Sequence, residues 1–402
     1  MPRTCAIILC LLLLAGMALR LGWSMSRGTD IRSLAVLPDQ VEYLQAGTNV
    51  LTDQGMWFFD DRFGQQIWAG RMPGYPLFVA ACKADVRVIR VAQALIDLST
   101  ALAIFLIARR WLHERRALLA CGLVVFNPLL VYFSGLVLSE TLYVAMLAWS
   151  LYLVLRQRTV IVGLLLCAAA IHVRPSGIAM PVALAVLAPW IWQHVRPVRA
   201  ALLLMIIAVG ITLVVLAPWA MRNRAILGRT IWLTTNGGIT LYDGVRPGAT
   251  GASDQRFVKA MPELQSMNEL QRDDLFQRLN WQAIHADPLR IMNLAAVKTA
   301  RTWSPVPLSE QFGSNRLYVL VGLGYGVPLF ALALWGLIRS ELPWRVRLLL
   351  IAPAILITLM HALSVGSLRY RLPADPLLAV IAVSARSIGG SRVTASGRLS
   401  RA

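Results

Sequence analysis

Long runs of apolar residues alternate with polar connectors along most of the chain. A helix needs roughly 17–25 mostly apolar residues to cross a bilayer, so runs near this length predict membrane spans. The candidate spans are 5–23, 88–108, 117–134, 137–155, 159–173, 177–193, 200–220, 316–338, 346–364 and 372–388. The pattern predicts an all-α polytopic membrane protein with about ten transmembrane helices.

Basic residues are distributed unevenly among the connectors, and their distribution predicts the topology. Alternate connectors and the C-terminal tail carry clusters of arginine: Arg109, Arg110, Arg115, Arg116, Arg156, Arg158, Arg196, Arg199, Arg339, Arg345, Arg347, Arg386, Arg392, Arg398 and Arg401. The short connectors 134–139, 172–176 and 361–371 are nearly free of clusters. Because positively charged loops stay in the cytoplasm, we expect these clusters and both termini to be cytoplasmic.

Two stretches admit a second interpretation. Residues 159–193 could form one long helix broken at 172–176, which would export the 339–347 loop. Two short spans with Arg174 at the outer turn agree better with the charge rule. The run 5–23 could be a cleaved signal peptide, but no convincing cleavage site follows it, so an uncleaved anchor is favoured.

The favoured topology leaves two long segments, 24–87 and 221–314, on the outer side. The second segment opens with turns rich in glycine and asparagine. It continues with apolar residues at helical spacing over 263–285, and another helical stretch starts at Asp287. Apolar stripes with polar flanks predict that these helices lie on the membrane surface. We therefore expect one membrane domain, 1–402, with two outer loops.

The composition agrees with a membrane protein and limits the kinds of partner that the protein can bind. Hydrophobic residues make up 57% of the chain and charged residues 15%, a balance that a soluble domain rarely reaches. The net charge of +19 does not indicate nucleic acid binding, because the basic residues lie at the ends of apolar runs. The five cysteines have no metal-ligand or disulfide spacing. The arginine bias and the lack of Asn-x-Ser/Thr sites suggest a bacterial source, hence an inner-membrane protein.

The unusual polar residues fall on the outer side of the predicted topology. They are Asp39, Glu42, Arg71, Glu140, Arg174, Arg222, Asn223, Arg224, Lys298, Arg301, Arg369 and Arg371. Ionisable groups at membrane depth are costly, so several at one level favour a shared polar site. Simpler interpretations remain: an arginine at a helix end can be an anchor, and Asp39 can cap a helix over 41–52. Asp97 lies inside an apolar run and receives no role.

Group transfer from a lipid phosphate suits this set of side chains. A carboxylate can take a proton from an attacking hydroxyl, which contributes roughly 10²–10⁴-fold to a rate. Arginines bind the charge that grows on a leaving phosphate. Neither step needs a metal or another cofactor, and no Asp-x-Asp motif is present to hold a metal.

Several short motifs, in this order and on this side, carry a resemblance to a known family. They are Pro38-Asp39 with Tyr43, Arg71 with Pro73-Gly74-Tyr75-Pro76, Asn127-Pro128, Ser139-Glu140, Arg174-Pro175, Pro218-Trp219, Arg222-Asn223, Thr235-Asn236-Gly237-Gly238, Leu241-Tyr242, Pro288, Lys298 and Arg369-Tyr370-Arg371-Leu372-Pro373 with Pro376. Over nearly its whole length the chain resembles the family 39 glycosyltransferases of the C-type (GT-C) membrane superfamily. These include protein O-mannosyltransferases and the lipid A aminoarabinose transferase.

The resemblance implies roles for individual residues. Asp39 matches the presumed catalytic base, and Glu140 matches a second acidic position with a positioning role. The positions that would hold the donor phosphate are Arg71, Arg174, Arg369, Arg371 and Lys298. The substrate loops would contribute Tyr43, Tyr75, Arg222, Asn223 and Asn236. Gln40 stands where some relatives carry a second acid, which puts a protein acceptor in doubt.

The sequence therefore predicts an inverting transfer of a sugar, hexosyl or pentosyl, from a polyprenyl-phosphate donor to an acceptor hydroxyl. The acceptor would be a glycan, a lipid or a protein, and the site would face the periplasm or the exterior. A transporter or lipid flippase is the alternative, since intramembrane charges such as Asp97 and Arg174 can mark a transport path. The lack of repeated halves and of paired broken helices counts against it. A scaffold for envelope assembly is a third, less economical hypothesis.

Overall fold

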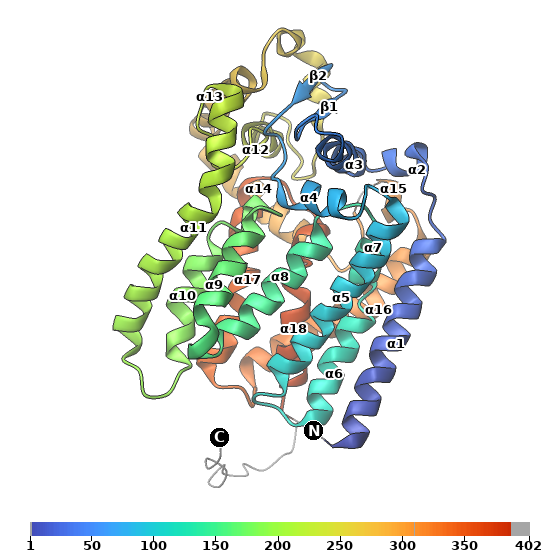
Figure 1. Ribbon diagram of the computed structural model, residues 1–402, viewed down its shortest axis with the longest axis vertical. Coiled ribbons are helices and arrows are strands. Elements are labelled where there is room, and N and C mark those ends of the chain that lie inside the picture. The colour runs from blue at the N-terminus through green and yellow to red at the C-terminus, as the bar shows by residue number, and fades with distance from the viewer. Residues whose placement is uncertain (1, 309, 387–402) are drawn as a thin grey trace.

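The fold is a slanted bundle of helices with a layer of short elements covering one of its ends (Figure 1). A computed structural model describes residues 2–308 and 310–386. The bundle contains α1 (Arg3–Met25), α5 (Val86–Ala108), α6 (Glu114–Val125), α7 (Pro128–Ser134), α8 (Glu140–Val154), α9 (Val160–Ile171), α10 (Met180–Leu187), α11 (Pro197–Leu227), α16 (Arg316–Ile338), α17 (Trp344–Leu363) and α18 (Asp375–Val383).

The layer at the upper end in Figure 1, here called the outer layer, comes from the two segments that the sequence predicts to face outward. The first supplies α2 (Ile31–Ala35), α3 (Pro38–Leu51), the antiparallel strands β1 (Phe58–Asp60) and β2 (Gln65–Ile67), and α4 (Gly74–Ala81). The second supplies α12 (Gly237–Val245), 3₁₀ turns at Gln255–Ala260 and Pro262–Gln265, α13 (Glu269–Ala286), α14 (Pro288–Thr302) and α15 (Glu310–Gly313).

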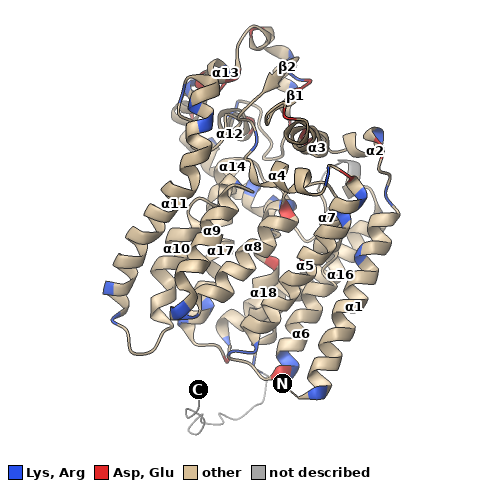
Figure 2. Ribbon diagram, in the orientation of Figure 1, with Lys and Arg blue, Asp and Glu red and all other residues tan. Residues whose placement is uncertain are grey.

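Length and hydropathy make this an integral membrane protein. In the described part of the chain, 5 helices are long and apolar enough to cross a bilayer: α1, α5, α11, α16 and α17. The pair α6 and α7, bent by 50°, would make a sixth. Charged residues gather toward the two ends of the bundle and are sparse in its middle (Figure 2). The predicted count of ten spans stays a prediction, because α8, α9, α10 and α18 are shorter.

Each predicted span coincides with helix in the structure. The stretch 159–193 contains two separate helices, α9 and α10, with Arg174 in the connection between them. The last predicted span, 372–388, contains α18, and its final residues lie outside the described part, as do Arg392, Arg398 and Arg401. The end of α18 bonds to the 339–341 connector, where Glu341 N donates to Ser384 O over 3.0 Å.

The bend between α6 and α7 follows from an Asn-Pro pair. The Asn127 side chain accepts hydrogen bonds from the amides of Leu129 (2.9 Å) and Leu130 (3.1 Å), so it caps α7. Pro128 has no amide hydrogen to continue α6 and is well suited to the first position of a new helix. This bend directs α7 toward the outer layer (Figure 1).

Asp97, which received no role from the sequence, pairs with Arg20 of α1 inside the bundle. The Arg20 Nη2 to Asp97 Oδ2 distance is 2.5 Å, and both side chains are fully buried. Arg20 also donates from Nη1 to the carbonyl of Val125 at the end of α6 over 2.9 Å. The ion pair joins α1 to α5, and the hydrogen bond from Arg20 joins α1 to α6, so Asp97 and Arg20 stabilise the packing of these three helices.

The two outer segments are hydrogen-bonded to each other. Glu269, the first residue of α13, accepts from the backbone amides of Trp68 and Ala69, and from Thr235 over 3.0 Å. Gln65 on β2 donates to the Gln265 carbonyl over 2.8 Å. These bonds fix the β-hairpin against α13, and the segment after β2 leads directly into the site described next.

Candidate functional site

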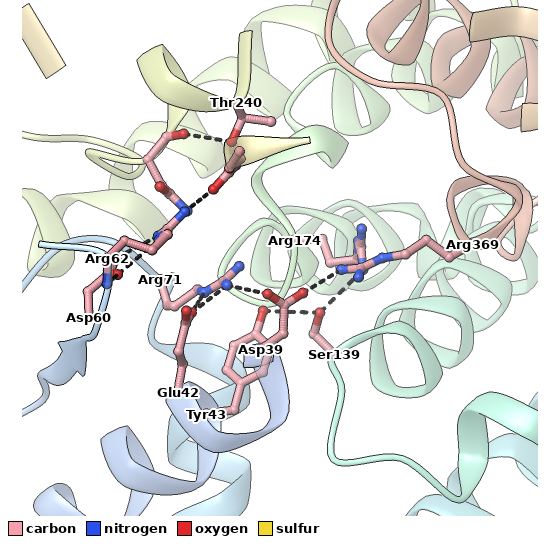
Figure 3. Close-up of polar contacts among 12 residues, drawn as sticks. Asp39, Glu42, Tyr43, Asp60, Arg62, Arg71, Ser139, Arg174, Thr240 and Arg369 are labelled. Atoms are coloured by element: carbon pink, nitrogen blue, oxygen red, sulfur yellow. Dashed lines mark hydrogen bonds and ion pairs between the residues drawn. The ribbon is translucent and has the colours of Figure 1, made fainter. Parts of the chain in front are cut away.

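Six side chains of alternating charge form one continuous row at the junction of the bundle and the outer layer; we call it the ion-pair chain. Its members, in order, are Glu42, Arg71, Asp39, Arg369, Glu140 and Arg174. All but Glu140 are labelled in Figure 3. The successive nitrogen–oxygen distances are 2.5, 2.6, 2.9, 2.9 and 2.6 Å. Three cations and three anions make the row neutral as a whole.

Five regions distant in sequence contribute to this row. Asp39 and Glu42 lie three residues apart on α3, which places them on one face of the helix. Arg71 lies between β2 and α4, and Glu140 is the first residue of α8. Arg174 precedes the 3₁₀ turn Pro175–Gly177, and Arg369 lies within the 3₁₀ turn Leu368–Arg371.

The start of α3 differs from the helix over 41–52 that the sequence suggested. The helix begins at Pro38, and Leu37 is its N-cap residue. Proline suits the first helical position because the amide hydrogen it lacks would be unpaired there. Asp39 therefore lies in the first turn and does not cap the helix; its carboxylate contacts Arg71 and Arg369 instead.

The two carboxyl groups of α3 have opposite electrostatic environments. Burial raises the pKa of Asp39, but Arg71 and Arg369 together outweigh burial and hold the pKa well below its usual range. Burial also raises the pKa of Glu42, and there Arg71 does not offset the burial and the repulsion from Asp39. The carboxylates raise the pKa of Arg71 and Arg369. Of the two carboxyl groups of α3, Glu42 therefore takes up a proton the more readily.

Accessibility also varies along the ion-pair chain. The Glu140 side chain is 2% exposed, while those of Asp39 and Arg369 are 25% and 26% exposed. The centre of the row is thus partly exposed, and the buried Glu140 forms ion pairs with Arg369 and Arg174.

The two predicted tyrosines behave differently. Tyr43 donates to the Ser139 hydroxyl over 3.3 Å, and the Arg71 guanidinium lies 5.3 Å from the centre of its ring. Tyr75 is fully buried; its ring contacts Tyr43 edge-on at 4.8 Å, and its hydroxyl donates to Gln93 over 2.6 Å. Tyr43 therefore borders the ion-pair chain, and Tyr75 packs behind it.

An aromatic stack beside the arginines had no sequence prediction. The rings of His361 and Tyr370 are parallel within 5°, with centres 3.7 Å apart. Arg174 and Arg369 lie 5.8 and 5.6 Å from the centre of the Tyr370 ring. Tyr370 was visible only as the middle of an Arg-Tyr-Arg motif, and nothing in the sequence linked it to His361.

Arg371 and Lys298 were predicted to hold a phosphate, but their side chains are engaged elsewhere. Arg371 lies 3.4 Å from Asp375 and donates to the Ser304 carbonyl. Lys298 is fully buried and donates to the Leu363 carbonyl over 2.8 Å. Both act on segments adjacent to Arg369 and neither contacts the ion-pair chain.

Three other predicted residues also lie outside the ion-pair chain. Arg222 donates to the carbonyls of Met56 and Trp68 over 2.6 and 2.7 Å, and Asn223 donates to Ile231 over 2.9 Å. These bonds attach the end of α11 to the outer segments. Asn236 precedes α12 and lines a cavity of about 20 Å³ below the β-hairpin, enough for about one water.

The loop that carries Arg369 is held between α12 and α14. A Cβ at Gly244 of α12 would overlap the backbone oxygen of Ser364, and a Cβ at Gly366 would overlap the backbone of Lys298. The Gly366 amide donates to the Gly251 carbonyl over 2.8 Å. Only glycine permits this close approach, so the second outer segment fixes the position of Arg369.

The sequence matches no protein-family model and no curated protein. Among solved structures, the chain is similar to the archaeal oligosaccharyltransferase AglB from Archaeoglobus fulgidus in complex with an inhibitory peptide and a dolichol-phosphate. The TM-score is 0.54 at 14% identity, over 94% of this chain and 50% of the other. The apo form of the Archaeoglobus fulgidus enzyme gives 0.52 at 11% identity, over 93% and 50%.

This chain has the GT-C fold. The fold implied by the sequence resemblance is therefore confirmed, and the chain spans about half the length of the oligosaccharyltransferase structures it matches. ArnT from Cupriavidus metallidurans bound to undecaprenyl phosphate gives a TM-score of 0.40 at 14% identity, over 93% of this chain and 76% of that one. Within the GT-C fold of this chain, the ion-pair chain is a charge-balanced row where the bundle meets the outer layer.

Proposed function

We propose that this protein transfers a sugar from a polyprenyl-phosphate carrier to an acceptor hydroxyl, with inversion at the sugar carbon. The observation that carries the proposal is the ion-pair chain, because three arginines and three carboxylates meet where the bundle joins the outer layer. The dolichol-phosphate named with the similar AglB structure supports a lipid-phosphate donor. The sugar would be a hexose or a pentose, and the acceptor a glycan, lipid or protein.

In the proposed reaction the acceptor oxygen attacks the anomeric carbon while the bond from that carbon to the phosphate oxygen breaks. The phosphate leaves with the bonding electron pair and gains one negative charge. Arg369, Arg174 and Arg71 bind this charge through fork-shaped guanidinium groups, in a partly dry setting where electrostatic stabilisation is strong. The acceptor proton passes to a carboxylate of α3, the role that the sequence gives to Asp39.

The remaining residues would support these groups. Glu140 positions Arg174 and Arg369, with which it forms ion pairs of 2.6 and 2.9 Å. For Lys298 and Arg371 we propose a role in holding the segments around Arg369, since Lys298 bonds to the Leu363 carbonyl and Arg371 contacts Ser304 and Asp375. Tyr43, next to Arg71 and Ser139, would border the sugar.

The proposed location follows from the charge distribution. The arginine-rich connectors favour a bacterial inner membrane with both termini cytoplasmic and the ion-pair chain facing the periplasm. The apolar helices and the slanted bundle suit a donor whose lipid tail stays in the bilayer.

The test uses the full chain in membranes with a panel of labelled polyprenyl-phosphate sugars and an extract of native envelope as acceptor. We compare the wild type with Asp39→Asn and with Asp274→Asn, an exposed carboxylate that pairs with Arg229. Label should leave the carrier with the wild type and Asp274→Asn, and at low donor concentration it should leave much more slowly with Asp39→Asn. No transfer from any donor by a folded wild type would refute the proposal, and carrier movement without transfer would identify a flippase.

A further inference from the structure

The ion-pair chain has two unlike ends. Among the described residues, Arg174 closes one end with a single carboxylate partner, Glu140. Glu42 closes the other end, and its single arginine partner there is Arg71. The interior members each have partners on both sides. An anion is accommodated best at the cationic end, and a proton is taken up best at the anionic end.

The three carboxylates differ in the oxygen that each can offer. On Asp39 both oxygens are bonded to an arginine: Oδ1 accepts from Arg71 over 2.6 Å and Oδ2 accepts from Arg369 over 2.9 Å. Glu140 has a spare oxygen, Oε2, but that atom is buried away from solvent. On Glu42 both bonds from Arg71 fall on Oε2, and in the described part of the chain Oε1 accepts none. Oε1 is also not among the buried unpartnered atoms.

We propose that Glu42 is the general base of the transfer reaction and that Asp39 is a positioning residue that holds Arg71 and Arg369. This inference rests on the proposed function and changes which carboxylate receives the proton. No motif of the sequence resemblance includes Glu42; only its place at the end of the ion-pair chain singles it out.

The stereochemistry of the reaction agrees with this division. Inversion needs the attacking oxygen and the leaving phosphate on opposite faces of the sugar carbon. A phosphate held mainly by Arg174 and Arg369, with Arg71 at its far side, lies toward one end of the row, so the base is expected toward the other end. Glu42 lies beyond Arg71 on the side of the β-hairpin (Figure 3), next to the outer segments through which an acceptor would approach.

The charge balance of the row also agrees. A polyprenyl-phosphate sugar is a phosphodiester with one negative charge, so its binding gives the neutral row and donor together a charge of −1. Cleavage of the bond to the sugar leaves a phosphate with two negative charges, and the total becomes −2. Uptake of the acceptor proton by Glu42 restores one charge at the far end, where attraction by the arginines is weakest. Burial already raises the pKa of Glu42, whereas the pKa of Asp39 is lowered. When the environments of two carboxyl groups shift their pKa values in opposite directions, the two groups can take different roles in catalysis.

The groups that act on Glu42 come from three elements. Arg71 precedes α4, Asp39 lies on the same helix, and Arg62 belongs to the β-hairpin. Arg71 and Arg62 favour the charged form and Asp39 opposes it. The charges that act on Glu42 in the described part of the chain include no histidine, so the acidic limb of a pH profile should report Glu42.

The experiment measures transfer by the purified full chain in nanodiscs, over a pH series, for the wild type, Glu42→Gln, Glu42→Asp and Asp39→Asn. Glu42→Gln keeps an oxygen for Arg71 and cannot accept the proton. Its kcat should fall about 10²–10⁴-fold with little change in the donor KM, and the residual activity should lose the acidic limb. Asp39→Asn should raise the donor KM and keep that limb, because the two arginines lose their shared partner. Glu42→Asp should recover part of the kcat.

Binding of undecaprenyl phosphate to each variant separates folding from chemistry. Glu42→Gln should bind this probe within a few-fold of the wild type. If Glu42→Gln retains wild-type kcat while Asp39→Asn has none, the proton goes to Asp39 and only the present inference fails. If Glu42→Gln does not bind the probe, Glu42→Asp decides. A Glu42→Asp variant that binds the probe but is inactive overturns the inference, and a Glu42→Asp variant that binds the probe and is active supports it. A wild type that transfers nothing overturns the proposed function and this inference together.

Discussion

Breaking the buried Arg20–Asp97 pair should destabilise the protein far more than breaking an ion pair at its surface. Both side chains are fully buried, and Arg20 additionally bonds to the carbonyls of Gly16 and Val125. Removing one partner leaves the other charge in a medium with little water, which costs about 3–5 kcal/mol in buried pairs. We expect losses of this size for Arg20→Met and for Asp97→Leu.

The two single replacements should not be equal. A carboxylic acid left alone can take up a proton and become neutral, whereas a guanidinium stays charged at any usable pH. Asp97→Leu should therefore be the more damaging change. The double variant Arg20→Met with Asp97→Leu should recover most of the loss, because two apolar side chains need no charge partner.

Denaturant titration of the full chain in mild detergent gives the four free energies of unfolding that this comparison needs. The matched control is Glu341→Gln, which breaks the Arg116–Glu341 pair, whose side chains are 30% and 44% exposed. Such exposed pairs contribute about 0–1 kcal/mol. Single losses at Arg20 and Asp97 no larger than the control, or a double variant that simply sums the two losses, would refute the reasoning.

Three further predictions concern the outer layer. Gly244→Ala should reduce transfer at least tenfold by displacing the loop of Arg369, whereas Gly237→Ala, where a Cβ meets nothing within 4 Å, should not. Glu269→Gln should expose the amides of Trp68 and Ala69 to hydrogen exchange, at a cost of about 1–3 kcal/mol for the lost acceptor. Burial lowers the pKa of Lys298 to about 8, below that of an unfolded lysine, so the unfolded state binds more protons above pH 8. The unfolding free energy of the wild type should therefore rise relative to Lys298→Met as pH increases from 8 to about 10, measured by denaturant titration.

The positions of the helices could be predicted from sequence because a bilayer imposes a simple length and composition. The predicted span 316–338 coincides with α16, and 346–364 differs from α17 by two residues or fewer at either end. The partner of Asp97 could not be predicted in this way, since Arg20 lies in another apolar run 77 positions away. Periodicity places a residue on a helix face but does not say which helix that face meets.

The candidate site was predictable in its members and not in its order. Asp39, Arg71, Glu140, Arg174 and Arg369 were all expected at one polar level, and the structure joins them in one row. Arg371 was expected with Arg369, yet it lies two residues further along a 3₁₀ turn and faces Asp375. The predicted topology gives the level of a side chain in the membrane but not the direction in which it points. The contacts of Arg371 and Lys298 could therefore be seen only in the three-dimensional structure.

The short helices beside the ion-pair chain have a consequence for the bilayer itself. α8 has 15 residues and α9 has 12, so at about 1.5 Å per residue they reach about 23 and 18 Å, less than a hydrocarbon thickness of about 30 Å. A membrane adapts to such hydrophobic mismatch by thinning around the short helices. Because Glu140 begins α8 and Arg174 follows α9, the thinned region borders the arginines. We expect lipid headgroups on that side of the bilayer to lie closer to these arginines, while the lipid tails remain in the bilayer.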